Sequence, residues 1–197
     1  MQLIPHTAFL AEMERAGVSL TGTSALTFGR YAETDRFWIW PWPPQDLLSL
    51  LSAILAHAAP REHCDLWRPG GIWHEDEPSF IDSIRESVLR GFAIPADHQG
   101  ALRFARSESA ALLGLLLSFA FAGSNVNDDV CAIPDTGDYI IRISHHAVVH
   151  VEARNATLTQ SLVAHMASRG WDLPTEVPDS TFKIPSWMAV RDPAAPI

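Results

Sequence analysis

Two groups of residues in this 197-residue chain carry side chains suited to metal binding or acid–base catalysis. In the first group, His63, Cys64 and Asp65 are followed ten residues later by the acidic run His74–Glu77. Each of these residue types can ligate a metal or exchange a proton. Their spacing, however, is neither CxxC nor HExxH, the patterns that fix a metal geometry. The spacing therefore favours a solvated loop over a metal site.

The second group is His145, His146 and His150. Alternation along a strand would place His146 and His150 on one face, as two ligands of one metal require, but no third ligand is apparent nearby. Ser144, His145 and Asp138 supply the residue types of a catalytic triad, yet neighbours on a strand point to opposite faces. We therefore expect no catalytic residue, no metal and no cofactor.

The rest of the sequence contains no nucleophile elbow, no Walker loop and no dinucleotide-binding glycine motif. The net charge is −9, and no basic patch with interleaved aromatic residues is present. This charge pattern argues against direct nucleic-acid binding and favours a cationic partner.

The segment 61–78 combines glycine, proline and charge without periodicity, which predicts an exposed loop between two helices. Loops of this length often carry function. The loop also holds two tryptophans, a residue type that is over-represented at binding hot spots, although core packing is the common alternative. We predict that the loop contacts a protein partner through six residues: Trp67, Trp73, His74, Glu75, Asp76 and Glu77.

The stretch 129–170 has the strongest local signals. Three short β-rich runs, at 130–133, 139–143 and 148–151, predict antiparallel strands, the first two joined by a turn that ends in Gly137. In the middle strand one face should meet a core and the other should partly face water.

A helix should follow these strands and cover the core side. Thr157 and Gln160 fit a capping box, Leu158, Leu162 and Met166 repeat at helical spacing, and a glycine stands at position 170, where a left-handed C-terminal residue belongs.

Apolar periodicity and stop signals predict the remaining elements. We expect helices over 7–16, from Pro44 to Pro60, over 79–90 and from an N-cap at Ser107 to Gly123, with strands within 18–39 and over 101–104. The predicted fold class is α+β, with small antiparallel sheets packed against several amphipathic and buried helices. Residues 1–197 should form one domain, within which 44–123 could form a helical sub-region.

Two features favour a reducing cytoplasm. Cys64 and Cys131 lie in dissimilar surroundings and predict inert, buried thiols instead of a disulfide framework. The first residues lack the basic and apolar regions of a signal peptide. The longest apolar stretch, 110–122, is too short for a bilayer core of about 30 Å, so we expect no membrane association.

Three segments carry a resemblance to known proteins: NVNDDVCAIPDTGDYIIRISHHAVVHVEARN, TLTQSLVAHMASRGWDLP and FKIPSWM. They resemble small uncharacterised bacterial proteins, some of which are similar to immunity proteins encoded beside secreted toxins. The resemblance covers about the C-terminal third and carries no residue roles. It implies an acidic cytoplasmic protein that neutralises a cognate toxin by direct binding, with a basic toxin domain as the expected partner. Two alternatives stay open, a metal-dependent hydrolase using the His/Asp/Glu clusters and a non-enzymatic adaptor subunit. The missing catalytic motifs favour a non-enzymatic role.

Overall fold

The computed structural model describes residues 1–21, 25–28, 36–39, 46–73, 80–122, 129–144 and 148–171. The strands are β1 (Gln2–Ile4), β2 (Ser19–Thr21), β3 (Ala25–Thr27), β4 (Arg36–Ile39), β5 (His63–Trp67), β6 (Ala101–Ala105), β7 (Val130–Pro134), β8 (Tyr139–Ile143) and β9 (Val149–Ala153). The helices are α1 (His6–Arg15), α2 (Leu47–Ala58), α3 (Phe80–Gly91), α4 (Ser109–Ala122) and α5 (Ala156–Ser168). These elements confirm the α+β prediction.

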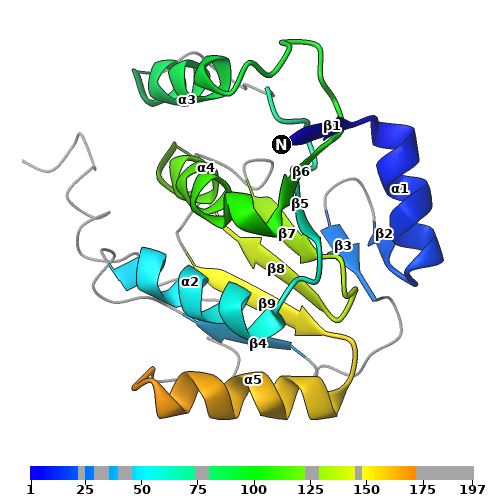
Figure 1. Cartoon of the computed structure of the whole chain (residues 1–197), viewed down its shortest axis with the longest axis vertical. Helices are drawn as coiled ribbons and strands as arrows, with labels where there is room; N and C mark the ends of the chain where they lie inside the picture. The colour runs from blue at the N-terminus through cyan, green and yellow to red at the C-terminus, as the bar shows by residue number, and fades with distance from the viewer. Residues whose placement is uncertain are drawn as a thin grey trace, which may run out of the picture.

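Seven of the strands form one antiparallel sheet in the order β1-β6-β5-β7-β8-β9-β4 (Figure 1). Its centre contains the predicted meander β7-β8-β9. Gly137 closes the first turn with φ +65° and donates its N–H to the Pro134 carbonyl at 2.9 Å. That left-handed backbone is one that glycine adopts without strain. The second turn, at His145 and His146, lies outside the described residues.

The predicted loop 61–78 is wrong for residues 63–67. These residues form β5, an interior strand that pairs with β6 on one side and β7 on the other. The strand links the N-terminal half of the chain to the C-terminal meander, so the two halves share one sheet.

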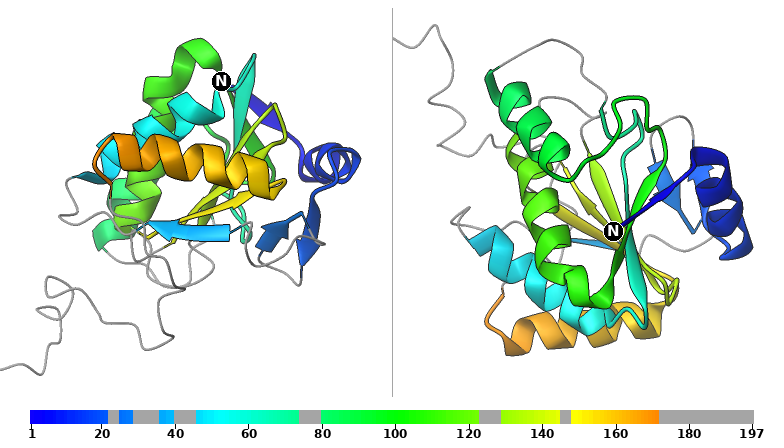
Figure 2. Two further views of the ribbon diagram at one scale, coloured as in Figure 1. Left: turned by 90° about the horizontal axis from the view of Figure 1, so that it is seen from below. Right: turned by 45° about the horizontal axis from the view of Figure 1, so that its top comes forward.

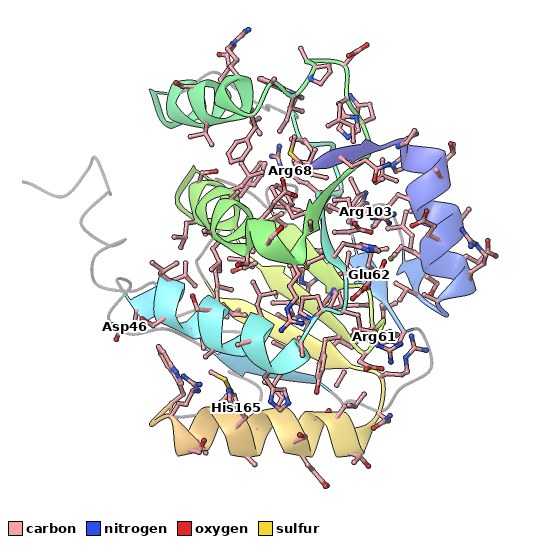
Figure 3. All side chains as sticks on the ribbon, viewed as in Figure 1. Asp46, Arg61, Glu62, Arg68, Arg103 and His165 are labelled. Atoms are coloured by element: carbon pink, nitrogen blue, oxygen red, sulfur yellow. The ribbon has the colours of Figure 1, made fainter. Side chains whose placement is uncertain are left out.

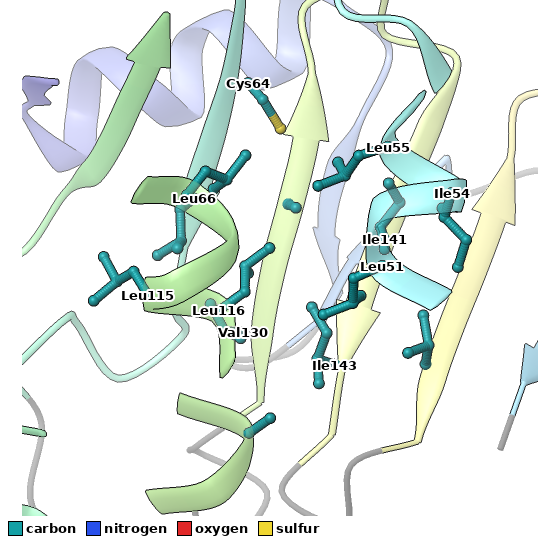
Figure 4. Close-up of a cluster of buried hydrophobic side chains, with 14 of the residues drawn as sticks. Leu51, Ile54, Leu55, Cys64, Leu66, Leu115, Leu116, Val130, Ile141 and Ile143 are labelled. Atoms are coloured by element: carbon teal, nitrogen blue, oxygen red, sulfur yellow. The ribbon is translucent and has the colours of Figure 1, made fainter. Parts of the chain in front are cut away.

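Both faces of the sheet are buried, whereas the sequence predicted that one face would partly meet water. Register partners share a face, so the first face carries the row Leu102, Leu66, Ala132, Ile141 and Val151 across β6, β5, β7, β8 and β9. All five are buried in the larger core, part of which is drawn in Figure 4. Ile140 points to the second face and is only 3% exposed.

Helices α2, α4 and α5 cover the first face, and α1 with the β2–β3 hairpin lies on the opposite side (Figure 2). From α1, Phe9 and Met13 enter the core of the second face. The sheet is therefore sandwiched between two layers, which explains why β-rich runs of the sequence are apolar on both sides.

Helix α5 has the predicted apolar stripe, with Leu162 and Met166 fully buried, and Gly170 has φ +82° as expected at its end. Its N-cap, however, is Asn155, whose side-chain Oδ1 accepts the N–H of Leu158 at 3.0 Å. The predicted cap Thr157 is an exposed residue of the first turn.

Helix α4 is nearly uniformly apolar and packs over β6 and β7. Its predicted N-cap, Ser107, is wrong, because a 3-10 turn at Arg106–Glu108 precedes the helix and contains that serine. Glu108 in this turn accepts the N–H of Ala105 at 2.9 Å and pairs with the N-terminal ammonium group. Among the described residues, no helix has the length and apolar character needed to cross a bilayer.

Candidate functional site

The six residues predicted to contact a partner fall into three different settings. Trp67 closes β5 and is 1% exposed on the second face of the sheet. Its ring stacks on Phe9 of α1, with centroids 5.9 Å apart and planes at 21°. The indole N–H is buried and has no acceptor among the described residues. Trp67 is therefore a core residue, because it belongs to β5, a strand that was not predicted from the sequence.

Trp73 follows the turn after β5. Gly71 makes this turn with φ +87°, and a Cβ there would stand 2.6 Å from Oε1 of Gln99. The fully buried Arg68 donates from Nη1 to the Gly71 carbonyl at 3.2 Å, and its guanidinium lies 5.7 Å from the Phe119 ring centroid. Figure 3 shows Arg68 close to α4. The contacts of Arg68 and Gly71 thus fix the backbone of the turn that leads to Trp73.

The side chain of Trp73 is only partly buried and packs against the larger core. Arg90 of α3 lies over its ring, 5.9 Å from the centroid, and Arg90 is also paired with Glu86 one helical turn earlier. An arginine over an indole face is a favourable cation–π contact. The remaining predicted contact residues, His74, Glu75, Asp76 and Glu77, lie outside the described residues, in the segment that joins Trp73 to α3.

Asp65 belongs to the predicted His63/Cys64/Asp65 cluster, but it has a structural partner. Its two carboxylate oxygens accept from Nε and Nη2 of Arg103 on β6, both at 2.8 Å. Nη2 of Arg103 also donates to Glu12 of α1 at 2.5 Å, and Figure 3 shows Arg103 on the α1 side of the sheet. The hydrogen bonds to Asp65, followed by those to Glu12, raise the pKa of Arg103. This network holds α1 on the second face.

His63 and Cys64 are also in structural surroundings. Asp135 accepts the backbone N–H groups of Arg61, Glu62 and His63 at 2.7, 2.8 and 3.4 Å, and the His63 ring stands 3.9 Å away. Burial would raise the pKa of Asp135, but these hydrogen bonds together lower it. Burial raises the pKa of Cys64 well above its ordinary range, so the thiol stays protonated at neutral pH.

Cys131 is equally inert, since burial raises its pKa to about 12. Both cysteines are free and buried, as predicted. They belong to different cores on opposite faces of the sheet, Cys64 to the first and Cys131 to the second.

The histidine group predicted near position 145 is only partly described, because His145 and His146 lie outside the described residues. His150 is 8% exposed and accepts on Nδ1 from Nη2 of Arg142 at 2.6 Å. Nε of Arg142 lies 3.9 Å from Asp129. Since guanidinium groups only donate, the ring proton of a neutral His150 must sit on Nε2.

Of the three triad residue types, Asp138 and Ser144 lie at opposite ends of β8, and His145 lies outside the described residues. Ser144 accepts the Val148 N–H on Oγ at 3.3 Å, which closes the turn before β9. Asp138 lies 3.9 Å from Arg154. Both residues therefore help to shape the hairpins that flank β8.

A row of polar residues on the second face was not predicted from the sequence. Glu152 is 4% exposed and accepts at 2.7 Å from both the Thr27 hydroxyl and the Phe28 N–H. It faces the same way as Arg142 and His150, because the register alternates along β8 and β9. Charged or polar residues at every second position of an apolar strand were the signal that could have identified it.

Among the described residues, no three His, Cys, Asp or Glu side chains are grouped so that they could hold a metal ion. Comparison of the chain with protein-family models, with curated proteins and with solved structures finds no match. The likeness of the C-terminal third to toxin-immunity proteins thus stays a prediction.

Proposed function

We propose that this chain is a cytoplasmic binding protein that neutralises a bacterial toxin by direct contact, in the manner of an immunity protein. The observation that carries the proposal is the attachment of the acidic run 74–77 to an anchored tryptophan. Trp73, which precedes the run, is held by the larger core and by Arg90, and α3 begins shortly after it.

Charge supports the same proposal. With a net charge of −9, the chain would attract a basic toxin domain, and such attraction mainly accelerates association. The ionisable groups of β5 and its neighbours have structural partners: Asp65 binds Arg103, and Asp135 binds backbone N–H groups. These groups hold the fold together, which leaves binding as the role best supported.

The test begins with affinity purification from the native host to identify a co-purifying protein. That protein is then expressed in a sensitive strain with and without this chain. The proposal expects growth arrest by the partner alone and restored growth when the chain is present. A partner that is not toxic, or toxicity that the chain does not relieve, would contradict the toxin-neutralising role.

A matched pair of charge reversals then locates the contact. One variant changes Glu75, Asp76 and Glu77 to Lys. The control changes three exposed acidic residues elsewhere to Lys: Glu14, Glu62 and Asp97. Both variants change the net charge equally. Slower association in the first variant only would place the contact at the run; equal slowing in both would mean long-range attraction without a local contact.

A further inference from the structure

Helices α2 and α5 pack against each other over the first face of the sheet, and each contains a single titratable residue. These residues are His57, in the last turn of α2, and His165, in the last turn of α5. Their ring centroids are 4.7 Å apart, with the planes inclined at 37°. Figure 3 shows His165 in the space between α5 and α2.

Both side chains are half-buried. Nε2 of His165 is buried and has no hydrogen-bond partner among the described residues. Nε2 of His57 has one long contact, 3.4 Å to the hydroxyl of Ser161, which lies one turn before His165. The described residues therefore offer these two nitrogens no carboxylate that would hold a charged ring.

The elements around this pair supply little compensating charge. Tyr139 of β8 meets the His57 ring edge-on at 6.1 Å, and its hydroxyl donates to the Leu158 carbonyl at 3.2 Å. The α4 sequence contains no titratable residue, and β9 turns Val149, Val151 and Ala153 to this core.

The charged groups near the helix ends also give little compensation. Arg61 and Arg169, which follow α2 and α5, are exposed cations, and Asp138 beside Tyr139 lies 3.9 Å from Arg154. Within the described ranges, an imidazolium at His57 would therefore face a second histidine and no carboxylate.

We propose that the contact between His57 and His165 is sensitive to pH. It holds α5 against α2 while both rings are neutral, and it weakens when the rings are protonated. The proposal concerns the fold itself and does not depend on the toxin-neutralising function. Protonation of both rings would place two like charges 4.7 Å apart at a helix–helix interface, and like charges at that separation repel.

The direction of the effect follows from proton linkage. Burial, followed by the nearby His165, lowers the pKa of His57 below its ordinary value of 6.5. A released His57 therefore binds protons at a higher pH than a packed one. The contact contributes its full stability above pH 6.5, and this contribution is lost as the pH falls through 6.5 toward the lower pKa of the packed ring.

The experiment is amide hydrogen exchange by NMR on the full chain at pH 7.5 and 5.5, with each rate divided by the intrinsic rate at that pH. Protection of the Leu162 and Met166 amides in α5 should be lower at pH 5.5 than at pH 7.5, since the released His57 ring binds protons at a higher pH than the packed ring. Titration of the ring protons in the same samples should give a pKa for His57 below the ordinary 6.5.

Two variants remove the charge by different routes, His165→Gln and His57→Phe, the second of which keeps an aromatic ring at the contact. His57→Phe should abolish most of the pH-dependent loss of protection, whereas His165→Gln should only reduce it, because burial is the larger cause of the lowered pKa of His57. His98→Gln, which removes a histidine outside this interface, should retain it. An undiminished loss in both contact variants, or a pKa for His57 at or above 6.5 in the parent chain, would overturn the proposal.

Discussion

Replacement of Arg103 by Met should be among the more costly changes in the described part of the chain. Asp65 accepts two hydrogen bonds from Arg103 and has a side chain only 3% exposed. Its neighbour in register on β7 is the apolar Ile133. Without Arg103, a carboxylate would stay buried with its main partner gone. Breaking a buried ion pair in this way costs about 3–5 kcal/mol. The measurement is urea unfolding followed by circular dichroism at pH 7.

The double variant Asp65→Leu/Arg103→Met should recover most of that loss and lie within about 1 kcal/mol of the parent, because an apolar pair of similar volume leaves no charge buried. Glu12→Gln is the matched control. Its carboxylate, 33% exposed, binds the same guanidinium from α1, and a pair that water still reaches contributes only about 1 kcal/mol or less.

The pH dependence gives an independent check on Arg103→Met. An unpaired buried carboxylate has a raised pKa, so its penalty is present above that pKa and shrinks as the pH falls and Asp65 takes up a proton. The gap between variant and parent should therefore narrow on going from pH 7 to pH 4. A loss below about 1 kcal/mol, or single-variant losses that simply add in the double variant, would refute the reasoning.

Three further changes test other parts of the fold by the same unfolding measurement. Leu116→Ala and Leu162→Ala, both at fully buried positions, should each cost about 2–5 kcal/mol, and a loss below about 0.5 kcal/mol would contradict the helix packing. Asn155→Ala should cost about 1 kcal/mol by removing the α5 cap, whereas Thr157→Ala should stay within about 0.5 kcal/mol. Ala59→Gly should stabilise the chain by up to about 1 kcal/mol, because Ala59 ends α2 with φ +44°; a loss would show that this conformation is not strained.

The meander β7-β8-β9 and helix α5 were predictable because their signals are local. Alternating β-rich runs, a turn ending in Gly137 and an apolar stripe in α5 each require only neighbouring residues. The cap of α5 shows the limit of such reasoning. Both Asn155 and Thr157 can cap a helix, and the choice depends on where β9 ends, which is Ala153.

Strand β5 could not be predicted because its stability depends on distant residues. The segment HCDLW contains a carboxylate that a sequence pattern assigns to the surface. Asp65 is tolerated inside because Arg103, 38 residues away, lies directly opposite in the register and binds it with two hydrogen bonds. No local pattern contains that pairing, and Trp67, which was predicted to be a contact residue, is buried as a consequence.

The partly buried position of Trp73 determines how a binding experiment at the candidate site must be interpreted. Its ring contacts both the larger core and Arg90, so Trp73→Ala should destabilise the chain by about 1–3 kcal/mol, below the range for a fully buried tryptophan. Arg90→Gln removes the exposed cation above the ring together with its pair to Glu86 and should cost about 0.5–1 kcal/mol. Dissociation from the partner is then measured under conditions where both variants remain folded. Faster dissociation in Trp73→Ala alone would indicate a contact made by the indole. If dissociation is unchanged while the urea midpoint falls, Trp73 serves the fold and the contact lies elsewhere.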